Sequence, residues 1–299
     1  MKTLGIDLGG TKIAIAVIED GNILQQASEA TPQTGYKAVL KAISELATIL
    51  LRTETDIEAI GLGVPGPVDY EKGSILFAAN IRGLKNMNIA PDLERELSFP
   101  VFIENDANAA GFAEHIYGAA KELSSSIYVT LSTGIGGGMF IGDEIVRGHH
   151  GSAGEIGHMI LQPDGPICGF GHSGCWEALA SGRAIARDLG HSNNEKTSTR
   201  MVFEKAKAGD RKALTVVNNA ARFSGRALAN LQKVFDPEGF VIGGGMLKTG
   251  SFYLDKIQKA ADYYSMGFPN VKIFPAKLST NAGVIGASAV ATMALRKLT

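Results

Sequence analysis

Residues 3–12 read TLGIDLGGTK, and this stretch decides the fold. Its apolar residues predict a strand over 3–8, Gly9-Gly10 predicts a turn, and a second strand is expected over 11–18. Asp20-Gly21 then predicts a tight hairpin turn into a third strand that begins near Asn22. The chain is therefore expected to open with three strands joined by a glycine turn and a hairpin turn.

The same order of elements recurs further along the chain. A strand is predicted over 127–131, a glycine turn over 132–138, a strand over 139–141, and the turn Gly142-Asp143 leads into a strand over 144–146. Two such copies, roughly 125 residues apart, indicate a duplicated molecule with two lobes. Two unrelated hairpins of similar sequence are the alternative.

Helices alternate with strands through the rest of the chain. Apolar spacing predicts helices over 36–52, 176–189, 211–235 and 284–295, and buried strands over 57–64 and 240–242. This alternation is typical of an α/β architecture. The lobes are expected over 1–118 and 119–283, with 284–299 as a C-terminal helix that packs back on the first lobe.

Composition excludes several classes of partner. The 299 residues suffice for one large domain or two lobes, and 29 basic against 30 acidic residues leave a net charge of −1, which argues against nucleic acid and anionic membranes. No apolar run approaches the roughly 18 residues of a membrane span, and Asp7 interrupts the first run too early for a signal peptide. We expect a cytoplasmic protein in which Cys168 and Cys175 are thiols or metal ligands.

Two glycine turns are candidates for phosphate binding. Gly9-Gly10-Thr11-Lys12 can present backbone N–H groups, a hydroxyl and an ammonium, and residues 132–138 offer similar donors without a lysine. Neither has the spacing of a Walker A loop, and each alone is typical of a tight hairpin. Their equivalent places in a duplicated chain favour two phosphate-binding hairpins, and Gly243–Gly245 would let the backbone approach a nucleoside.

Two sets of polar residues are candidates for contacting the substrate. Asn105 and Asp106 follow a short strand and open an alanine-rich helix, so they either cap that helix or Asp106 accepts the proton of a hydroxyl that attacks phosphorus. Glu155, His158 and Glu177 lie among glycines, where they either belong to a solvated loop or accept hydrogen bonds from a polyol.

Six ordered motifs carry a family resemblance: GIDLGGTK, ENDANAA, STGIGGG, GEIGH, GCWEALASG and VIGGG. Together they make the sequence similar, over nearly its whole length, to the ROK family of sugar kinases and sugar-responsive repressors. The resemblance implies the duplicated ribonuclease H-like two-lobe fold of actin and hexokinase, with a cleft between the lobes. It also implies phosphorylation of a hexose or N-acetylhexosamine, usually at the 6-hydroxyl, by Mg·ATP.

The resemblance assigns roles to individual residues of this chain. Asp106 would be the catalytic base, and Asp7 would lie near Mg²⁺ through water. The sugar would be held by Gly66, Asn80, Asn105, Glu155, His158 and Glu177. The phosphates would be held by Gly9, Gly10, Thr11, Lys12, Thr133, Gly134, Gly136 and Gly137, and the adenosine would be bordered by Gly244 and Gly245. A homodimer or tetramer is expected.

One departure from the family pattern concerns zinc. Many members bind zinc through the His of GEIGH and three Cys of a CxCGxxGCxE pattern, but residues 168–177 read CGFGHSGCWE, with Phe170 at the middle Cys position. His158, Cys168 and Cys175 give three ligands where structural zinc takes four, and His172 is a possible substitute. We expect no tightly bound zinc, with apolar contacts of Phe170 and Trp176 shaping the loop.

The leading hypothesis is a hexose kinase of glucokinase type. N-acetylmannosamine or N-acetylglucosamine kinase is the alternative, because residues 164–168 (DGPIC) and 174–186 (GCWEALASGRAIA) also resemble such enzymes, and fructokinase is less favoured. A repressor of the same family would need a helix-turn-helix domain ahead of the first hairpin, and we expect none here. A sugar-sensing protein without catalysis is a further class, disfavoured because Asp106 and both glycine turns are present.

Overall fold

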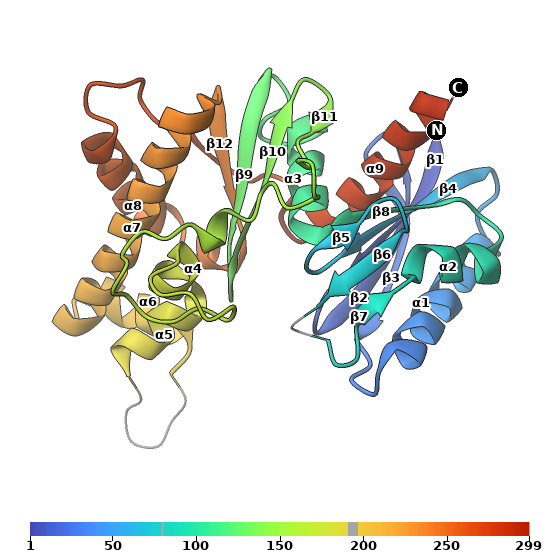
Figure 1. The fold of residues 1–299 in the computed structure, drawn as a ribbon, viewed down its shortest axis with the longest axis horizontal. Coiled ribbons are helices and arrows are strands. Elements are labelled where there is room, and N and C mark those ends of the chain that lie inside the picture. Colours follow the sequence, from blue (N-terminus) through green and yellow to red (C-terminus); the bar gives the residue numbers. More distant parts are fainter. Residues whose placement is uncertain (79–80, 191–196, 299) are drawn as a thin grey trace. The chain divides into compact units, whose positions relative to one another are not determined.

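The computed structural model describes residues 1–78, 81–190 and 197–298 (Figure 1). The chain forms two compact units. The first comprises Met1–Lys121, Gly138–Ala153 and Lys277–Thr299, and the second comprises Glu122–Gly137 and Gly154–Ala276. The lobe boundaries expected from the sequence stay a prediction.

A five-stranded sheet is the centre of the first unit. Its strands are β1 (Lys2–Leu8), β2 (Lys12–Glu19), β3 (Asn22–Ala30), β4 (Ile57–Val64) and β8 (Val101–Asn105), in the order β3-β2-β1-β4-β8. β1, β2 and β3 pair antiparallel, whereas β4 runs parallel to both β1 and β8. The three opening strands and the strand over 57–64 are thus confirmed.

Helices and a small sheet complete the described part of the first unit. The helices are α1 (Tyr36–Leu51), α2 (Ile89–Leu97), α3 (Asp106–Ile116) and α9 (Ala282–Leu298), with the short 3₁₀ helix η3 (Ser279–Asn281), and the sheet is β5 (Val68–Asp69), β6 (Ser74–Phe77) and β7 (Lys85–Met87). α9 packs on β1, β4 and α3. A Cβ on Gly5 or Gly61 would overlap the backbone of α9, so glycine in the strands permits this close approach.

The second sheet repeats the strand order of the first. It contains β9 (Ser125–Leu131), β10 (Ile135–Ile141), β11 (Glu144–Ile145), β12 (Gly239–Gly243) and β13 (Ile273–Pro275), in the order β11-β10-β9-β12-β13. β12 runs parallel to both β9 and β13. β10 begins in the second unit and ends in the first. A repeated order of this kind fits a duplicated chain.

The second unit is the more helical one. Its helices are α4 (Trp176–Ala180), α5 (Gly182–Leu189), α6 (Thr199–Lys207), α7 (Arg211–Phe235) and α8 (Ser251–Tyr264), with the 3₁₀ helices η1 (Ile156–His158) and η2 (Gly245–Thr249). The long helix α7 packs against α4, α5, α6 and α8. Within the part of the chain that the structure describes, no helix is long and apolar enough to cross a membrane.

Two sequence predictions were wrong in detail. The glycine turn expected over 132–138 is confined to 132–134, because the following glycines belong to β10. A Cβ on Gly137 would overlap the Ile156 side chain, so glycine serves close packing there. The single helix expected over 176–189 is divided at Ser181, whose extended backbone ends α4 and whose Oγ accepts the Ala184 N–H to cap α5.

Candidate functional site

Three parallel strands of the first unit end at one edge of its sheet. Asp7 on β1 aligns with Gly63 on β4, and Gly63 aligns with Glu104 on β8. A Cβ on Gly63 would lie 3.9 Å from the Cα of Asp106. Ligands of α/β proteins bind at the carboxyl ends of such strands. The two motifs that contain Asp7 and Asp106 therefore meet at the edge where a ligand is expected.

The junction between β8 and α3 holds the two residues of the ENDANAA motif that were assigned roles. Asn105 is the N-cap, because its Oδ1 accepts the N–H groups of Ala107 (2.9 Å) and Asn108 (3.1 Å). Its Nδ2 donates to the carbonyl of Gly66 at 3.1 Å. Asp106 is the first helical residue, where the helix dipole favours an ionised carboxylate. Capping is confirmed for Asn105, and the substrate roles of both residues stay predictions.

Asp7 lies beside the start of α9. A Cβ on Gly283 would overlap the Asp7 carboxylate, which shows how closely that helix approaches. Burial raises the pKa of Asp7 to about 6, although the Lys12 ammonium acts to lower it. None of the residues that the structure describes donates a hydrogen bond to this carboxylate. A partly buried carboxylate that accepts no hydrogen bond from the described residues can bind a hydrated cation such as Mg²⁺.

The first glycine turn leaves two polar side chains exposed. The Gly9 N–H donates to the carbonyl of Lys12 at 3.0 Å and closes the turn, while the Thr31 hydroxyl donates to the Gly9 carbonyl at 2.6 Å. Thr11 and Lys12 are exposed. The turn can therefore offer a hydroxyl and an ammonium to an anion, whereas the Gly9 N–H, which was also predicted to face phosphate, is bonded to the Lys12 carbonyl.

The second glycine turn is held by a hydrogen bond to Glu177. The Ile135 N–H donates to Oε2 of Glu177 at 2.9 Å, and Nη2 of Arg183 lies 3.5 Å from its Oε1. A Cβ on Gly134 would overlap this carboxylate, so glycine is required where the turn meets Glu177. The family resemblance assigns Glu177 to the sugar. In the second unit it also holds the turn predicted to bind phosphate.

Gly244 and Gly245 lie beside the same turn. Gly244 has a left-handed backbone (φ 95°), and a Cβ there would overlap the carbonyl of Leu131. A Cβ on Gly245 would lie 3.7 Å from the Ser132 hydroxyl. Because β9 and β12 are parallel neighbours, their carboxyl ends bring the two glycine segments together.

The carboxylates and the imidazole predicted to face a sugar also gather in the second unit. Nε2 of His158 lies 3.9 Å from Oε2 of Glu155, at the two ends of η1. Burial raises the pKa of Glu155, with His158 opposing the rise and Glu177 adding to it. His158 and Glu177 thus lie close enough to Glu155 to act on its pKa. Polar groups gathered in this way can bind the hydroxyls of one sugar.

The zinc-like cluster contains three donors. The ligand atoms of His158, Cys168 and Cys175 all lie within 4.8 Å of one another, and no further His, Cys, Asp or Glu of the described residues joins them. Nδ1 of His158 is buried without a hydrogen-bond partner, and both cysteines are free and buried. These residues fit a metal ion with three protein ligands, but not a closed four-ligand structural site.

The residues around this cluster differ in burial. Phe170, at the position of the missing Cys, is 55% exposed and packs edge-on against the His158 ring at 4.6 Å. His172 is exposed. Trp176 is fully buried and donates from Nε1 to the Ser224 hydroxyl at 3.2 Å. The apolar contact expected of Phe170 is therefore made on the imidazole itself.

Replacing Phe170 tests the metal prediction. We expect the chain, purified without chelator, to hold well under one zinc per molecule, and Phe170→Cys to raise zinc to about one per molecule by supplying the fourth ligand. Elemental analysis of the proteins, each purified without chelator, measures this. Phe170→Ser is the matched control, since it removes the ring without adding a thiolate. One retained zinc per molecule in the unaltered protein would contradict the prediction.

The predicted residues divide between the two units. The first unit holds Asp7, Gly9, Gly10, Thr11, Lys12, Gly66, Asn105 and Asp106, and the second holds Thr133, Gly134, Gly136, Gly137, Glu155, His158, Glu177, Gly244 and Gly245. Asn80 lies outside the described residues.

Comparison with known proteins gives one consistent result. The ROK family matches residues 3–294. A glucokinase of Streptomyces coelicolor is 36% identical over 310 aligned residues, which cover 97% of this chain and 97% of that protein.

Two solved structures give the same result. A ROK hexokinase from Thermus thermophilus superposes with a TM-score of 0.92 at 43% identity, covering 99% of this chain and all of that one. A ROK family glucokinase from Streptomyces griseus in complex with glucose and AMPPNP superposes with a TM-score of 0.85 at 35% identity, covering 98% of this chain and 100% of that one. The α/β fold of hexokinase type predicted from the sequence is thereby confirmed.

Proposed function

The chain belongs to the ROK family, and we propose that it is an ATP-dependent sugar kinase of glucokinase type that phosphorylates the 6-hydroxyl of a hexose. The full-length likeness to a glucokinase, and to a glucokinase structure with glucose and an ATP analogue, supports this proposal. The observation that carries it is the edge of the first sheet, where Asp7 on β1 and Asp106, directly after β8, lie on either side of the end of β4.

The proposed reaction assigns one task to each carboxylate. The sugar hydroxyl attacks the γ-phosphorus of ATP, the bond from that phosphorus to the bridging oxygen breaks, and ADP leaves. Asp106 accepts the hydroxyl proton, a role that suits a weak base because proton loss is late. Asp7 would hold Mg²⁺ through water, and the ion would neutralise phosphate charge.

The remaining residues position the substrates. The two glycine turns would hold the phosphates, Gly244 and Gly245 would border the adenosine, and Asn105, Asn80 and the Gly66 backbone would assist Glu155, His158 and Glu177 in holding the sugar. The hydrogen bond from Asn105 to Gly66 and the proximity of Glu155 to His158 support these assignments. Paired hydroxyls are bound well by such carboxylate and amide groups.

A panel of sugars tests the proposed function. ADP release is measured with glucose, mannose, fructose, N-acetylmannosamine and N-acetylglucosamine under saturating Mg·ATP. We expect the highest kcat/KM for glucose. A higher kcat/KM for an N-acetylhexosamine would favour the alternative that residues 164–168 and 174–186 suggest. Sugar binding without turnover on any member would contradict the kinase and favour a sensor.

We also propose that the protein is a homodimer or tetramer in the cytoplasm. Sedimentation measures the size of the assembly.

Asp7 predicts a pH-dependent stability difference. Its pKa in the folded chain is about 6, above the ordinary 3.8, so folding disfavours the charged form and the carboxylate costs stability once it ionises. Asp7→Asn should therefore stabilise the ligand-free protein by about 1 to 3 kcal/mol above pH 7, and the gain should vanish as pH falls to about 4. Melting temperatures measured across this range, with the exposed Asp20→Asn as control, test the prediction. A gain that does not change with pH would contradict it.

A further inference from the structure

A buried carboxylate that the proposed reaction does not use lies next to the proposed base. Glu104 belongs to β8, its side chain is fully buried, and it directly precedes Asn105 and Asp106. A buried charge is costly unless donors surround it. The partners of this carboxylate therefore indicate its role.

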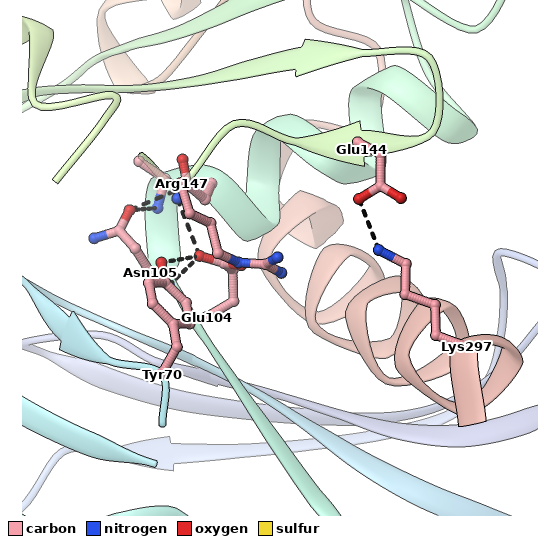
Figure 2. A network of polar contacts seen from close by, with 8 residues as sticks. Tyr70, Glu104, Asn105, Glu144, Arg147 and Lys297 are labelled. Atoms are coloured by element: carbon pink, nitrogen blue, oxygen red, sulfur yellow. Dashed lines mark hydrogen bonds and ion pairs between the residues drawn. The ribbon is translucent and has the colours of Figure 1, made fainter. Parts of the chain in front are cut away.

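Both oxygens of Glu104 are occupied by donors (Figure 2). Oε1 accepts the Asn105 N–H at 2.9 Å, Nδ2 of Asn108 at 3.0 Å, and the hydroxyl of Tyr70. Oε2 accepts Nε of Arg147 at 2.7 Å. Two of the four donors, Asn105 and Asn108, belong to the junction that carries Asp106, one on each side of it in the chain. The carboxylate thus fixes the backbone on which the proposed base stands.

The other two donors come from distant segments of the first unit. Tyr70 lies between β5 and β6, and Arg147 follows β11. The Arg147 guanidinium stacks over the Tyr70 ring, 5.0 Å from its centroid, and burial together with the neighbouring Glu104 charge raises the pKa of the Tyr70 hydroxyl. Tyr70 therefore stays a protonated donor, and the two side chains hold each other against the carboxylate.

We infer that Glu104 is a positioning residue for Asp106, an inference that rests on the proposed function. Glutamine at this position keeps the size of the side chain but replaces one acceptor oxygen with an N–H₂ group. That amide nitrogen must then face either the donors of the junction or Arg147, so the junction loses either its acceptor or the charged partner that holds the acceptor in place. A displacement of about 1 Å in a catalytic group can cost as much as a hundredfold in rate.

A double-mutant cycle separates positioning from a general structural role. Glu104→Gln is made in the unaltered chain and in Asp106→Asn, and kcat is measured by ADP release with the best sugar of the panel and Mg·ATP. A residue that acts through Asp106 loses its effect once Asp106 is gone. We expect Glu104→Gln to lower kcat about tenfold in the unaltered chain and less than about twofold in Asp106→Asn, with KM for Mg·ATP unchanged within about twofold.

Glu144→Gln is the matched control. Glu144 is a neighbouring carboxylate whose exposed ion pair with Lys297 spans 2.7 Å (Figure 2). The same chemical change there should leave kcat within about twofold of the unaltered value, because exposed ion pairs contribute little. An equal loss of kcat in Glu144→Gln and Glu104→Gln would overturn the inference.

Tyr70→Phe provides a second variant in case Glu104→Gln does not fold. It removes one donor to Oε1 and leaves the charges in place. We expect a loss of kcat of about threefold, again only where Asp106 is present. Loss of kcat by the same factor in both backgrounds would overturn the inference while leaving the kinase proposal standing. Full turnover by Asp106→Asn would instead overturn the proposed role of Asp106 and this inference with it.

Discussion

Asp106→Asn is expected to lose at least about a hundredfold of kcat, the usual contribution of a positioned base. The substitution keeps the size of the side chain at the first position of α3 but removes its ability to accept a proton. Asn105 and its bond to Gly66 remain, so sugar affinity should change little. ADP release measures kcat, and titration calorimetry measures sugar binding.

The exposed turn residue Asp143 supplies the control for this variant. Asp143→Asn makes the same chemical change away from the strand ends of the first sheet and should leave kcat unaltered. Near-normal turnover by Asp106→Asn would reject the assignment of Asp106 as the base.

Gly61→Ala should destabilise the first unit by about 3 kcal/mol, at the upper end of the usual overpacking cost. A Cβ on Gly61 would overlap the backbone of Ala287 and Ser288 in α9, and backbone atoms cannot move aside by rotating a side chain. The helix must then shift away from β4 along its length. Unfolding in urea, followed by circular dichroism, measures the change.

Gly63→Ala is the control on the same strand. A Cβ there would make ordinary contacts, 3.5 Å from the carbonyl oxygen of Ile6 and 3.6 Å from the Ala109 side chain. Its stability should change by less than about 1 kcal/mol, because alanine also reduces the freedom of the unfolded chain. Equal losses at the two positions would show that packing against α9 is not the cause.

Local pattern predicted most secondary structure because apolar spacing reports which face of an element is buried. The strand over 57–64 and the helix over 211–235 have the predicted bounds. The failures arise at residues whose contacts apolar spacing does not report. Gly137 lies in a strand that packs closely against Ile156, and Ser181 interrupts a helical pattern by capping the next helix.

The motifs also identified the segments that converge on each sheet edge, since residues after buried parallel strands meet at one end of the sheet. Their individual contacts were not predictable. Glu104 and Arg147 lie far apart in the sequence, and neither has a spacing that marks it as a partner of the other. The bond from Ile135 to Glu177 likewise depends on a glycine turn meeting a helix start.

By itself, the sequence determined the α/β class, the repeated hairpins and the residue types available for phosphate and sugar, because these follow from local periodicity and from motif chemistry. Only the tertiary structure decided which groups share a partner. It placed Asn105 against Gly66 and surrounded Glu104 with donors. Hydrogen bonds and close packing act over a few ångströms, and only the folded chain brings distant residues within that range.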